Sequence, residues 1–120
     1  MKKKILEKYL NITLTENQIE LFKKYEKYFL EQNSKINLIS KNDEKYLFEK
    51  HIFDSLALNL FLKDYDLDDK IIMDFGTGGG FPALPAAILY PQAEIFPLDS
   101  ISKKINAVQN IAQQLNLKNV

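Results

Sequence analysis

The apolar positions in the first third of the chain recur every three or four residues. Within residues 16–32 they are Ile19, Phe22, Tyr25 and Phe29. This spacing predicts an amphipathic helix. Thr15 and Gln18 have the spacing of a capping box, so we expect the helix to begin directly after Thr15. The polar run at 31–35 is expected to end it.

A second pattern of helical spacing covers residues 43–61. Asn42 or Asp43 is expected to cap this helix. The charged run at 64–69 predicts a solvated connector behind it. The buried positions expected in this second helix are Leu47, Ile52, Leu56 and Leu60.

The pattern changes at residue 70. Ile71, Ile72 and Met73 form a short apolar run, which predicts a buried parallel strand over 70–75 that ends near the acid Asp74. Glycines follow at positions 76, 78 and 80, and an apolar segment then predicts a helix over 82–90. A strand, a tight glycine turn and a helix start are typical of a nucleotide-cofactor site, because only glycine lets the backbone approach a ligand this closely.

A second apolar run, 93–98, predicts a second strand that ends at Asp99. A third helix is expected next, capped by Ser100 or Ser102, and residues 116–120 resemble the approach to a third strand. Such a β-α-β-α unit leaves sheet edges and apolar faces open, so we expect these 120 residues to be the first part of a longer protein or of a domain completed by something else. The residues expected to lie on one face of the third helix are Ile101, Ile105, Val108, Ala112 and Leu115.

Composition narrows the class of protein. With 46% apolar residues the chain can bury a core, and 120 residues are enough for one small domain. Cysteine is absent, which excludes disulfides and thiolate metal sites. The basic start at residues 1–4 is not followed by a long apolar stretch, so we expect no signal peptide, no membrane span and a cytoplasmic location.

Charge is balanced overall but unevenly placed. Residues 1–50 carry 11 lysines against 8 acids, whereas residues 51–120 carry 5 lysines against 8 acids. This polarity permits nucleic-acid contact through the amino-terminal half without requiring it. All 16 basic residues are lysines, so any phosphate would be met by point charges and not by bidentate guanidinium groups.

Two acids and one aromatic residue complete the predicted cofactor site. Asp99 follows the second strand, where its carboxylate can accept hydrogen bonds from ribose hydroxyls. Asp74 is expected to anchor the glycine turn, or to reach the ammonium end of a methionine moiety directly or through water. Phe81 can belong to the core or line the pocket. The glycine spacing differs from the dinucleotide motif Gly-x-Gly-x-x-Gly, although an acid at Asp99 suits either cofactor.

His51 is the only histidine of the chain. Without a second histidine or a cysteine we expect no metal site, and without a Gly-x-Ser-x-Gly elbow a Ser-His-Asp hydrolase is disfavoured. Asp54 and Ser55 lie three and four residues further on, hence on the same helix face. We expect all three side chains to pack the helical segment against the strand-containing part, and we assign no catalytic acid or base.

Four blocks of sequence carry a resemblance to a known family. They are Asn33-Ser34-Lys35-Ile36-Asn37-Leu38, Lys50-His51-Ile52-Phe53-Asp54-Ser55-Leu56, Asp74-Phe75-Gly76-Thr77-Gly78-Gly79-Gly80-Phe81-Pro82-Ala83-Leu84-Pro85 and Leu98-Asp99-Ser100-Ile101-Ser102-Lys103-Lys104. The third contains Asp-x-Gly-x-Gly-x-Gly, which resembles motif I of S-adenosylmethionine-dependent methyltransferases. Together the blocks resemble the RsmG family, also called GidB, over most of residues 16–120. The first block lacks the family's Trp.

The resemblance implies a fold and an activity. The fold is α/β: a helical amino-terminal segment, 1–62, then 63–120 as the first β-α-β-α part of a Rossmann-like S-adenosylmethionine-dependent methyltransferase domain. The activity is methylation of N7 of a guanine in bacterial 16S ribosomal RNA, with the small ribosomal subunit as partner and S-adenosylmethionine as cofactor. Gly76 and Phe81 are expected to contact this cofactor, with Gly78 in the same turn and Asp99 at the ribose.

Two other interpretations stay open. The 120 residues can be a truncated, non-catalytic piece that binds cofactor or RNA, or a nicotinamide oxidoreductase, which the glycine spacing disfavours. Because one βαβα unit leaves apolar surface uncovered, we expect the 120-residue chain alone to be weakly stable and silent in methyl transfer.

Overall fold

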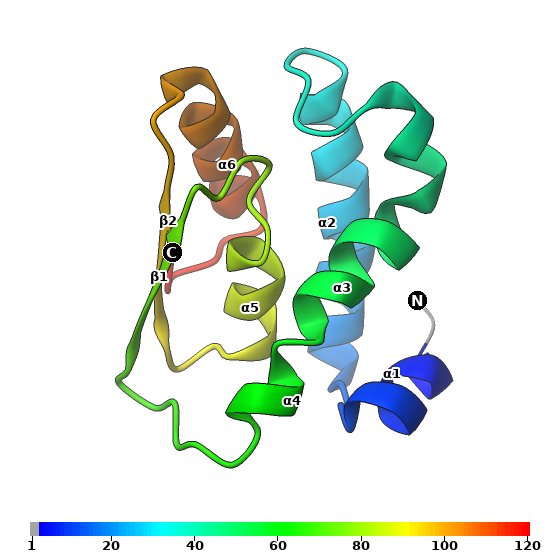
Figure 1. Ribbon diagram of the computed structural model, residues 1–120, viewed down its shortest axis with the longest axis vertical. Coiled ribbons are helices and arrows are strands. Elements are labelled where there is room, and N and C mark those ends of the chain that lie inside the picture. Colours follow the sequence, from blue (N-terminus) through cyan, green and yellow to red (C-terminus); the bar gives the residue numbers. More distant parts are fainter. Residues whose placement is uncertain (1–2) are drawn as a thin grey trace.

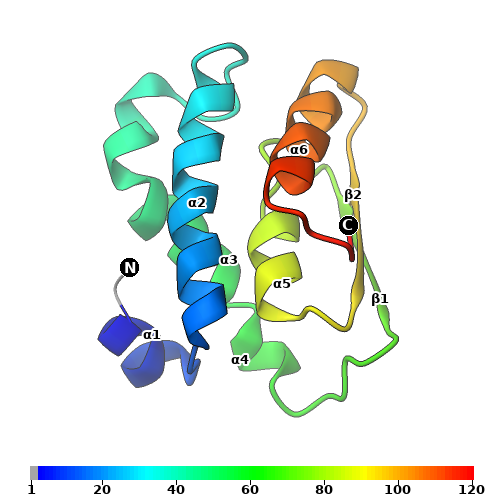
Figure 2. The same ribbon diagram turned by 180° about the vertical axis from the view of Figure 1, so that it is seen from behind.

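The computed structural model describes residues 3–120. Its elements form layers, which start with a two-stranded parallel sheet (Figure 1; Figure 2 shows the same layers from behind). Helices α5 (Ala83–Leu89) and α6 (Ser102–Gln114) lie on one face of the sheet, and the helical segment with α2 (Glu16–Asn33) and α3 (Phe53–Leu56) lies beyond them. A large hydrophobic cluster joins the helical segment to α5 and α6, and a smaller one lies between α5 and the sheet. The buried side chains of the large cluster come from both halves of the chain, for example Phe22 and Leu56 from the helical segment and Leu84 and Val108 from α5 and α6.

The first long helix is α2, Glu16–Asn33, close to the range predicted. Its capping box is confirmed, because Gln18 N donates to Thr15 Oγ1 over 3.1 Å and Thr15 N donates to Gln18 Oε1 over 2.9 Å. A shorter helix precedes it, α1 over Lys3–Leu10, which the sequence reasoning did not predict. Leu6 and Leu10 of α1 are buried, so packing against the core stabilises a segment too short to be helical alone.

The single helix predicted over 43–61 is wrong. The chain instead forms a 3₁₀ helix η1, Lys41–Tyr46, a π-helix η2, Leu47–Ile52, and two short α-helices, α3, Phe53–Leu56, and α4, Asn59–Leu62. Leu47 and Ile52 are five residues apart and both buried; a π turn, with its i→i+5 bonds, keeps them on one face. Leu60 was expected in the core but is 46% exposed.

The expected cap of that helix is also wrong. Ser40 precedes η1 and no side chain caps it. The Asp43 carboxylate is used elsewhere, 3.1 Å from Lys50 Nζ and 3.2 Å from His51 Nε2. A charged partner offers an aspartate stronger hydrogen bonds than a neutral backbone N–H, which explains the difference.

The parallel sheet is confirmed, but the prediction that the first strand is buried is wrong, because every residue of β1 is exposed or half-buried. Strand β1, Ile71–Phe75, pairs with β2, Glu94–Leu98, and α5, Ala83–Leu89, connects them. Ile95 N donates to Asn119 O over 2.7 Å, so the last residues reach the far edge of β2, although no third strand is formed there.

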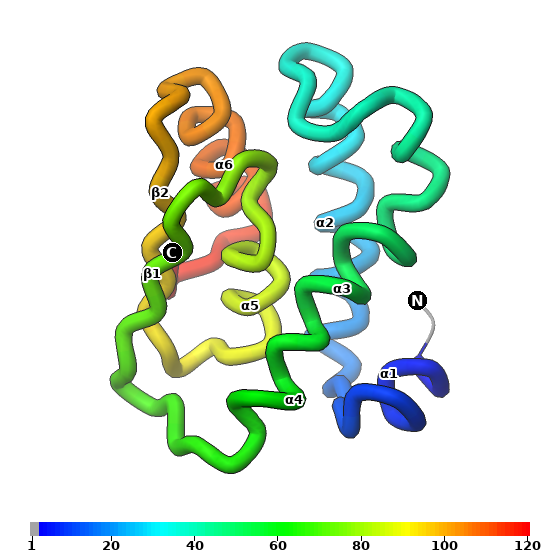
Figure 3. The backbone as a smooth tube through the Cα atoms, viewed as in Figure 1, coloured from blue at the N-terminus to red at the C-terminus, as the bar shows by residue number. Residues whose placement is uncertain are grey.

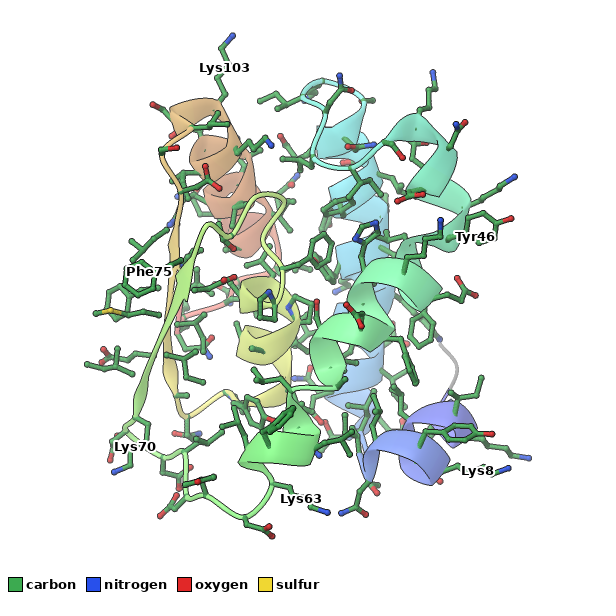
Figure 4. The ribbon with its side chains drawn as sticks, in the orientation of Figure 1. Lys8, Tyr46, Lys63, Lys70, Phe75 and Lys103 are labelled. Atoms are coloured by element: carbon green, nitrogen blue, oxygen red, sulfur yellow. The ribbon has the colours of Figure 1, made fainter. Side chains whose placement is uncertain are left out.

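One face of the sheet packs against α5 and α6, and the other is open, as the sequence predicted. Phe75 is 77% exposed and its ring points away from the helices (Figure 4). The remaining apolar side chains exposed on this outer face are Ile71, Met73, Phe96 and Leu98. Strands that are apolar at nearly every position are typical of sheets covered on both faces.

Helix α6, Ser102–Gln114, begins differently from the prediction. Ile101 occupies the cap position and no serine side chain caps the helix. Ile101 is 48% exposed, so it does not share the core face as expected, whereas Val108, Ala112 and Leu115 do. The backbone N–H of Ile101 instead donates to Asp99 Oδ1 over 2.9 Å, which makes the preceding aspartate the residue that shapes this helix start.

None of the helices within residues 3–120 is both long and apolar enough to cross a lipid bilayer.

Candidate cofactor site at the glycine turn

The glycine turn connects β1 to α5 at the carboxyl end of the sheet, where the backbone folds back on itself (Figure 3). Thr77 holds the turn: its N–H donates to Leu98 O at the end of β2 over 2.8 Å, and its carbonyl accepts from Gly80 N over 2.9 Å and Phe81 N over 3.1 Å. The turn is thus closed on itself and fixed to the end of β2. Thr77 is 3% exposed, and the sequence reasoning assigned it no role.

Glycine is required in the turn for two different reasons. Gly76 and Gly78 have φ of +69° and +56°, and a Cβ added at either would meet nothing within 4 Å. Gly80 has φ of +96°, and a Cβ there would lie 3.2 Å from side-chain atoms of Leu84 and Val108. The first two glycines therefore border open space, whereas Gly80 is packed against the core. Open space beside left-handed backbone is what a ligand that contacts the backbone needs.

Asp99 lies directly against this open part of the turn. Its Oδ2 accepts a hydrogen bond from Gly78 N over 2.9 Å, and its Oδ1 accepts from Ile101 N over 2.9 Å. The backbone N–H of Ile101 and then that of Gly78 lower the pKa of the Asp99 carboxyl below its usual 3.8. A charged carboxylate therefore stands beside the turn at neutral pH, with acceptor lone pairs left on both oxygens.

The Asp74 carboxylate is hydrogen-bonded to other groups of the protein. Its Oδ2 accepts from Thr77 Oγ1 over 2.7 Å and from Ala83 N, in the first turn of α5, over 3.1 Å. Burial raises the pKa of the Asp74 carboxyl, and these two hydrogen bonds oppose the rise. These contacts fit the interpretation of Asp74 as the anchor of the turn, while contact with a methionine ammonium stays a prediction.

Phe81 packs beneath the turn. Its ring centroid lies 5.3 Å from that of Phe29, 6.5 Å from that of Tyr25 and 5.2 Å from the His51 ring. The side chain is half-buried, so it belongs to the core on one side and faces solvent on the other. The interpretation of Phe81 as a core residue is therefore confirmed in part, while its place in the cofactor pocket stays a prediction.

The His51 side chain packs as predicted, but Asp54 does not. The His51 ring stacks at 30° to Phe81 and lies 3.2 Å from Asp43. The hydrogen bonds from Lys50 and then His51 lower the pKa of the Asp43 carboxyl. Ser55 Oγ donates to the His51 carbonyl over 2.6 Å, within its own helical turn. Asp54 is exposed, and the prediction that it packs the two parts together is wrong.

A groove runs between the helical segment and the glycine turn. It has a volume of about 370 Å³ and is lined by Asp54, Ser55 and Phe61 on one side and by Phe81 and Pro82 on the other. A larger hollow, about 450 Å³, involves Asn59, Tyr65 and Pro91 near the beginning of β2. That hollow is at the wrong end of the strands, since open α/β sheets bind ligands at their carboxyl ends.

Within residues 3–120, no three His, Asp or Glu side chains come together in a way that could hold an ion.

The residues that sequence reasoning missed are Thr77, which fixes the turn to the end of β2, and Asp43, which orients His51. A threonine inside a glycine turn and an acid eight residues before a histidine carry no distinctive spacing, so neither gave a usable signal.

Comparisons with known proteins agree on one family. The family model described as rRNA small subunit methyltransferase G matches residues 18–120. Among curated relatives, the Ribosomal RNA small subunit methyltransferase G of Leuconostoc citreum is 40% identical over 109 residues, which are 91% of this chain and 46% of the relative. The protein of that name from Flavobacterium psychrophilum is 44% identical over 107 residues, 89% of this chain and 50% of the relative. The chain spans about half the length of the curated relatives it matches.

Proposed function

Because the chain belongs to the rRNA small subunit methyltransferase G family, we propose that it is the cofactor-binding part of an enzyme that methylates N7 of a guanine in 16S ribosomal RNA. The cofactor is S-adenosylmethionine, held by Gly76, Gly78, Phe81 and Asp99. In this proposal residues 1–62 are the helical segment, and residues 63–120 begin a Rossmann-like methyltransferase domain. Because the proposed substrate is ribosomal RNA, the protein would act on the small ribosomal subunit in the cytoplasm.

One observation carries the proposal: the Asp99 carboxylate lies next to the side of Gly78 that faces open space. Gly78 N lies 2.9 Å from Asp99 Oδ2, and the position of its absent Cβ opens to space free of protein atoms. A ribose with two adjacent hydroxyls would find a carboxylate acceptor there, and the rest of a nucleoside could lie against the backbone of Gly76 and Gly78. The residues present therefore fit a nucleoside cofactor.

The proposed methyl transfer needs no catalytic acid or base from the protein. Bound at this turn, S-adenosylmethionine supplies an electrophilic methyl group. N7 of guanine carries a lone pair in the plane of the ring and no proton, so its reaction needs no general base. The contribution of this chain is to hold the reactants in line and to exclude water. Asp74 and Thr77 serve this by fixing the shape of the turn, since Thr77 Oγ1 donates to Asp74 over 2.7 Å.

A cofactor titration tests the proposal. S-adenosylhomocysteine and NAD are titrated separately into the 120-residue chain by isothermal calorimetry, and into Asp99→Ala. We expect S-adenosylhomocysteine to bind and NAD to bind much more weakly, and Asp99→Ala to weaken the first by about tenfold or more, because removing a charge-assisted acceptor costs about 1.5–3 kcal/mol. Tighter binding of NAD would favour the oxidoreductase interpretation. Equal affinity of parent and Asp99→Ala for S-adenosylhomocysteine would remove the ribose role of Asp99.

A further inference from the structure

The groove between α3 and the glycine turn has the chemistry of a site for one flat, polar-edged ring. Two of its walls are aromatic or flat and apolar, Phe81 and Pro82 on the side of the turn, and a third is the Phe61 ring, which is 77% exposed. An aromatic side chain this exposed beside a concave surface is available for stacking. Its volume of about 370 Å³ lies within the range of about 300–1,000 Å³ found for small-molecule sites.

The polar lining of the groove is acceptor-rich. The Asp54 carboxylate lines it and is exposed, and an ionised carboxylate can only accept hydrogen bonds. The Ser55 hydroxyl already donates its proton to the His51 carbonyl over 2.6 Å, so toward the groove Ser55 too is left with acceptor lone pairs. A ligand that fits must therefore present donors at its edge. A phosphate does not fit, because its charge would be repelled by Asp54.

We propose that this groove binds a guanine base, with the Asp54 carboxylate accepting hydrogen bonds from N1–H and the 2-amino group and with Phe61 and Phe81 flanking the ring. Guanine is the one common nucleobase with two adjacent donors on its Watson–Crick edge, which matches a carboxylate with two oxygens. Bases extruded from RNA are commonly read in this way, by that edge and by stacking on aromatic side chains.

This orientation suits the chemistry proposed above, and its relevance to RNA rests on that proposed function. The N7 atom lies at the opposite end of the purine from the 2-amino group. Asp54 belongs to α3, whereas the facing wall belongs to the glycine turn. A guanine held at Asp54 and flanked by Phe61 and Phe81 therefore leaves its N7 edge at the end of the ring away from the Asp54 carboxylate, free of hydrogen bonds to it. Asp54 is a specificity residue in this arrangement.

The test uses mononucleotides and the 120-residue chain. Guanosine, inosine and adenosine 5′-monophosphates are titrated separately while amide and side-chain resonances are followed by two-dimensional NMR. The variants are Asp54→Asn and Phe61→Ala, and their matched controls are Asp64→Asn, an exposed acid outside the groove, and Tyr65→Ala, an exposed aromatic residue outside it. The spectrum of each variant reports directly whether it is folded.

We expect guanosine monophosphate to shift the resonances of Ser55 and Phe61, which line the groove but not the proposed cofactor site, with inosine monophosphate weaker and adenosine monophosphate at least tenfold weaker. Asp54→Asn and Phe61→Ala should each weaken guanosine monophosphate about tenfold, while Asp64→Asn and Tyr65→Ala leave it unchanged. Absence of shifts in the groove, equal binding of the adenine nucleotide, or an unchanged affinity in Asp54→Asn would overturn the assignment.

The same samples separate this assignment from the cofactor proposal. S-adenosylhomocysteine is titrated into parent and Asp54→Asn, and we expect equal affinity, because Asp54 lies outside the contacts of Gly78 and Asp99. A parent that binds guanosine monophosphate in the groove but not S-adenosylhomocysteine would contradict the proposed function and leave the guanine site standing. The reverse result would remove the guanine site alone.

Discussion

Gly78 is the position where the proposed cofactor site can be separated from the stability of the fold. Its φ of +56° is left-handed, and a Cβ built on it meets nothing within 4 Å. Replacing it with alanine therefore introduces backbone strain of about 1–2 kcal/mol without a steric clash. Valine adds a branched side chain that projects into the open side of the turn, where we propose that the cofactor approaches the backbone.

Gly80 provides the matched control in the same turn. Its φ is +96°, and an added Cβ would lie 3.2 Å from Leu84 and Val108 side-chain atoms. Gly80→Ala therefore combines strain with crowding of the core, which together cost roughly 2–5 kcal/mol. It changes no atom on the open side of Gly78. Substitution of Gly78 should thus mainly weaken cofactor binding, whereas substitution of Gly80 should mainly lower the free energy of unfolding.

The assay pairs urea unfolding, followed by circular dichroism, with calorimetric titration of S-adenosylhomocysteine into samples that are still folded. We expect Gly78→Ala to lose about 1–2 kcal/mol of stability and Gly80→Ala about 2–5 kcal/mol. We expect Gly78→Val to bind at least 100-fold more weakly than the parent, and Gly80→Ala to keep the affinity of its folded fraction. If Gly78→Val binds S-adenosylhomocysteine as well as the parent does, the cofactor site is misplaced. If Gly80→Ala, while folded, loses as much affinity as Gly78→Val, the open side of Gly78 has no special role.

Two further predictions concern stability. Tyr25 is fully buried and, within residues 3–120, its hydroxyl finds no hydrogen-bond partner, so Tyr25→Phe should raise the free energy of unfolding by about 1–2 kcal/mol in urea; a loss of stability would show that the hydroxyl is paired. The pKa values of Asp43 and Asp99 are lowered from 3.8, so their stabilising effect is present above pH 3.8 and is lost as pH falls through the lowered values. Asp99→Asn should flatten this acid-side loss in thermal melts, and an unchanged pH dependence would contradict it.

Regular elements were predictable where one local rule was enough. The capping box of Thr15 and Gln18 determined the start of α2 because both hydrogen bonds lie within four residues. The two strands followed from short apolar runs bounded by glycine and proline. In these segments local preference and tertiary packing agree, which is the condition for reading structure from sequence.

The helical stretch over 41–62 was not predictable in the same way. Helical periodicity assumes 3.6 residues per turn, but Leu47 and Ile52 are five residues apart and the structure buries both by forming a π-helix. The choice depends on the shape of the core below, including the Phe81 ring, which comes from a segment 30 residues further along the chain. Likewise, nothing local to Asp43 shows that it will bind His51 instead of capping η1.

Asp74 and Asp99 show what sequence can and cannot give for the site itself. Both are aspartates at or near the end of a parallel strand, and position alone made both of them candidates. Their surroundings push their pKa values in opposite directions: burial raises that of Asp74, and backbone N–H groups lower that of Asp99. Asp74 Oδ2 accepts hydrogen bonds from Thr77 and Ala83 and so anchors the turn, whereas Asp99 keeps its charge beside the open backbone of Gly78. We therefore propose that Asp99 holds a ligand at this turn through its charge. A change at Asp74 should disturb the turn by removing the bonds to Thr77 and Ala83, in addition to removing the predicted contact with the ligand's ammonium group.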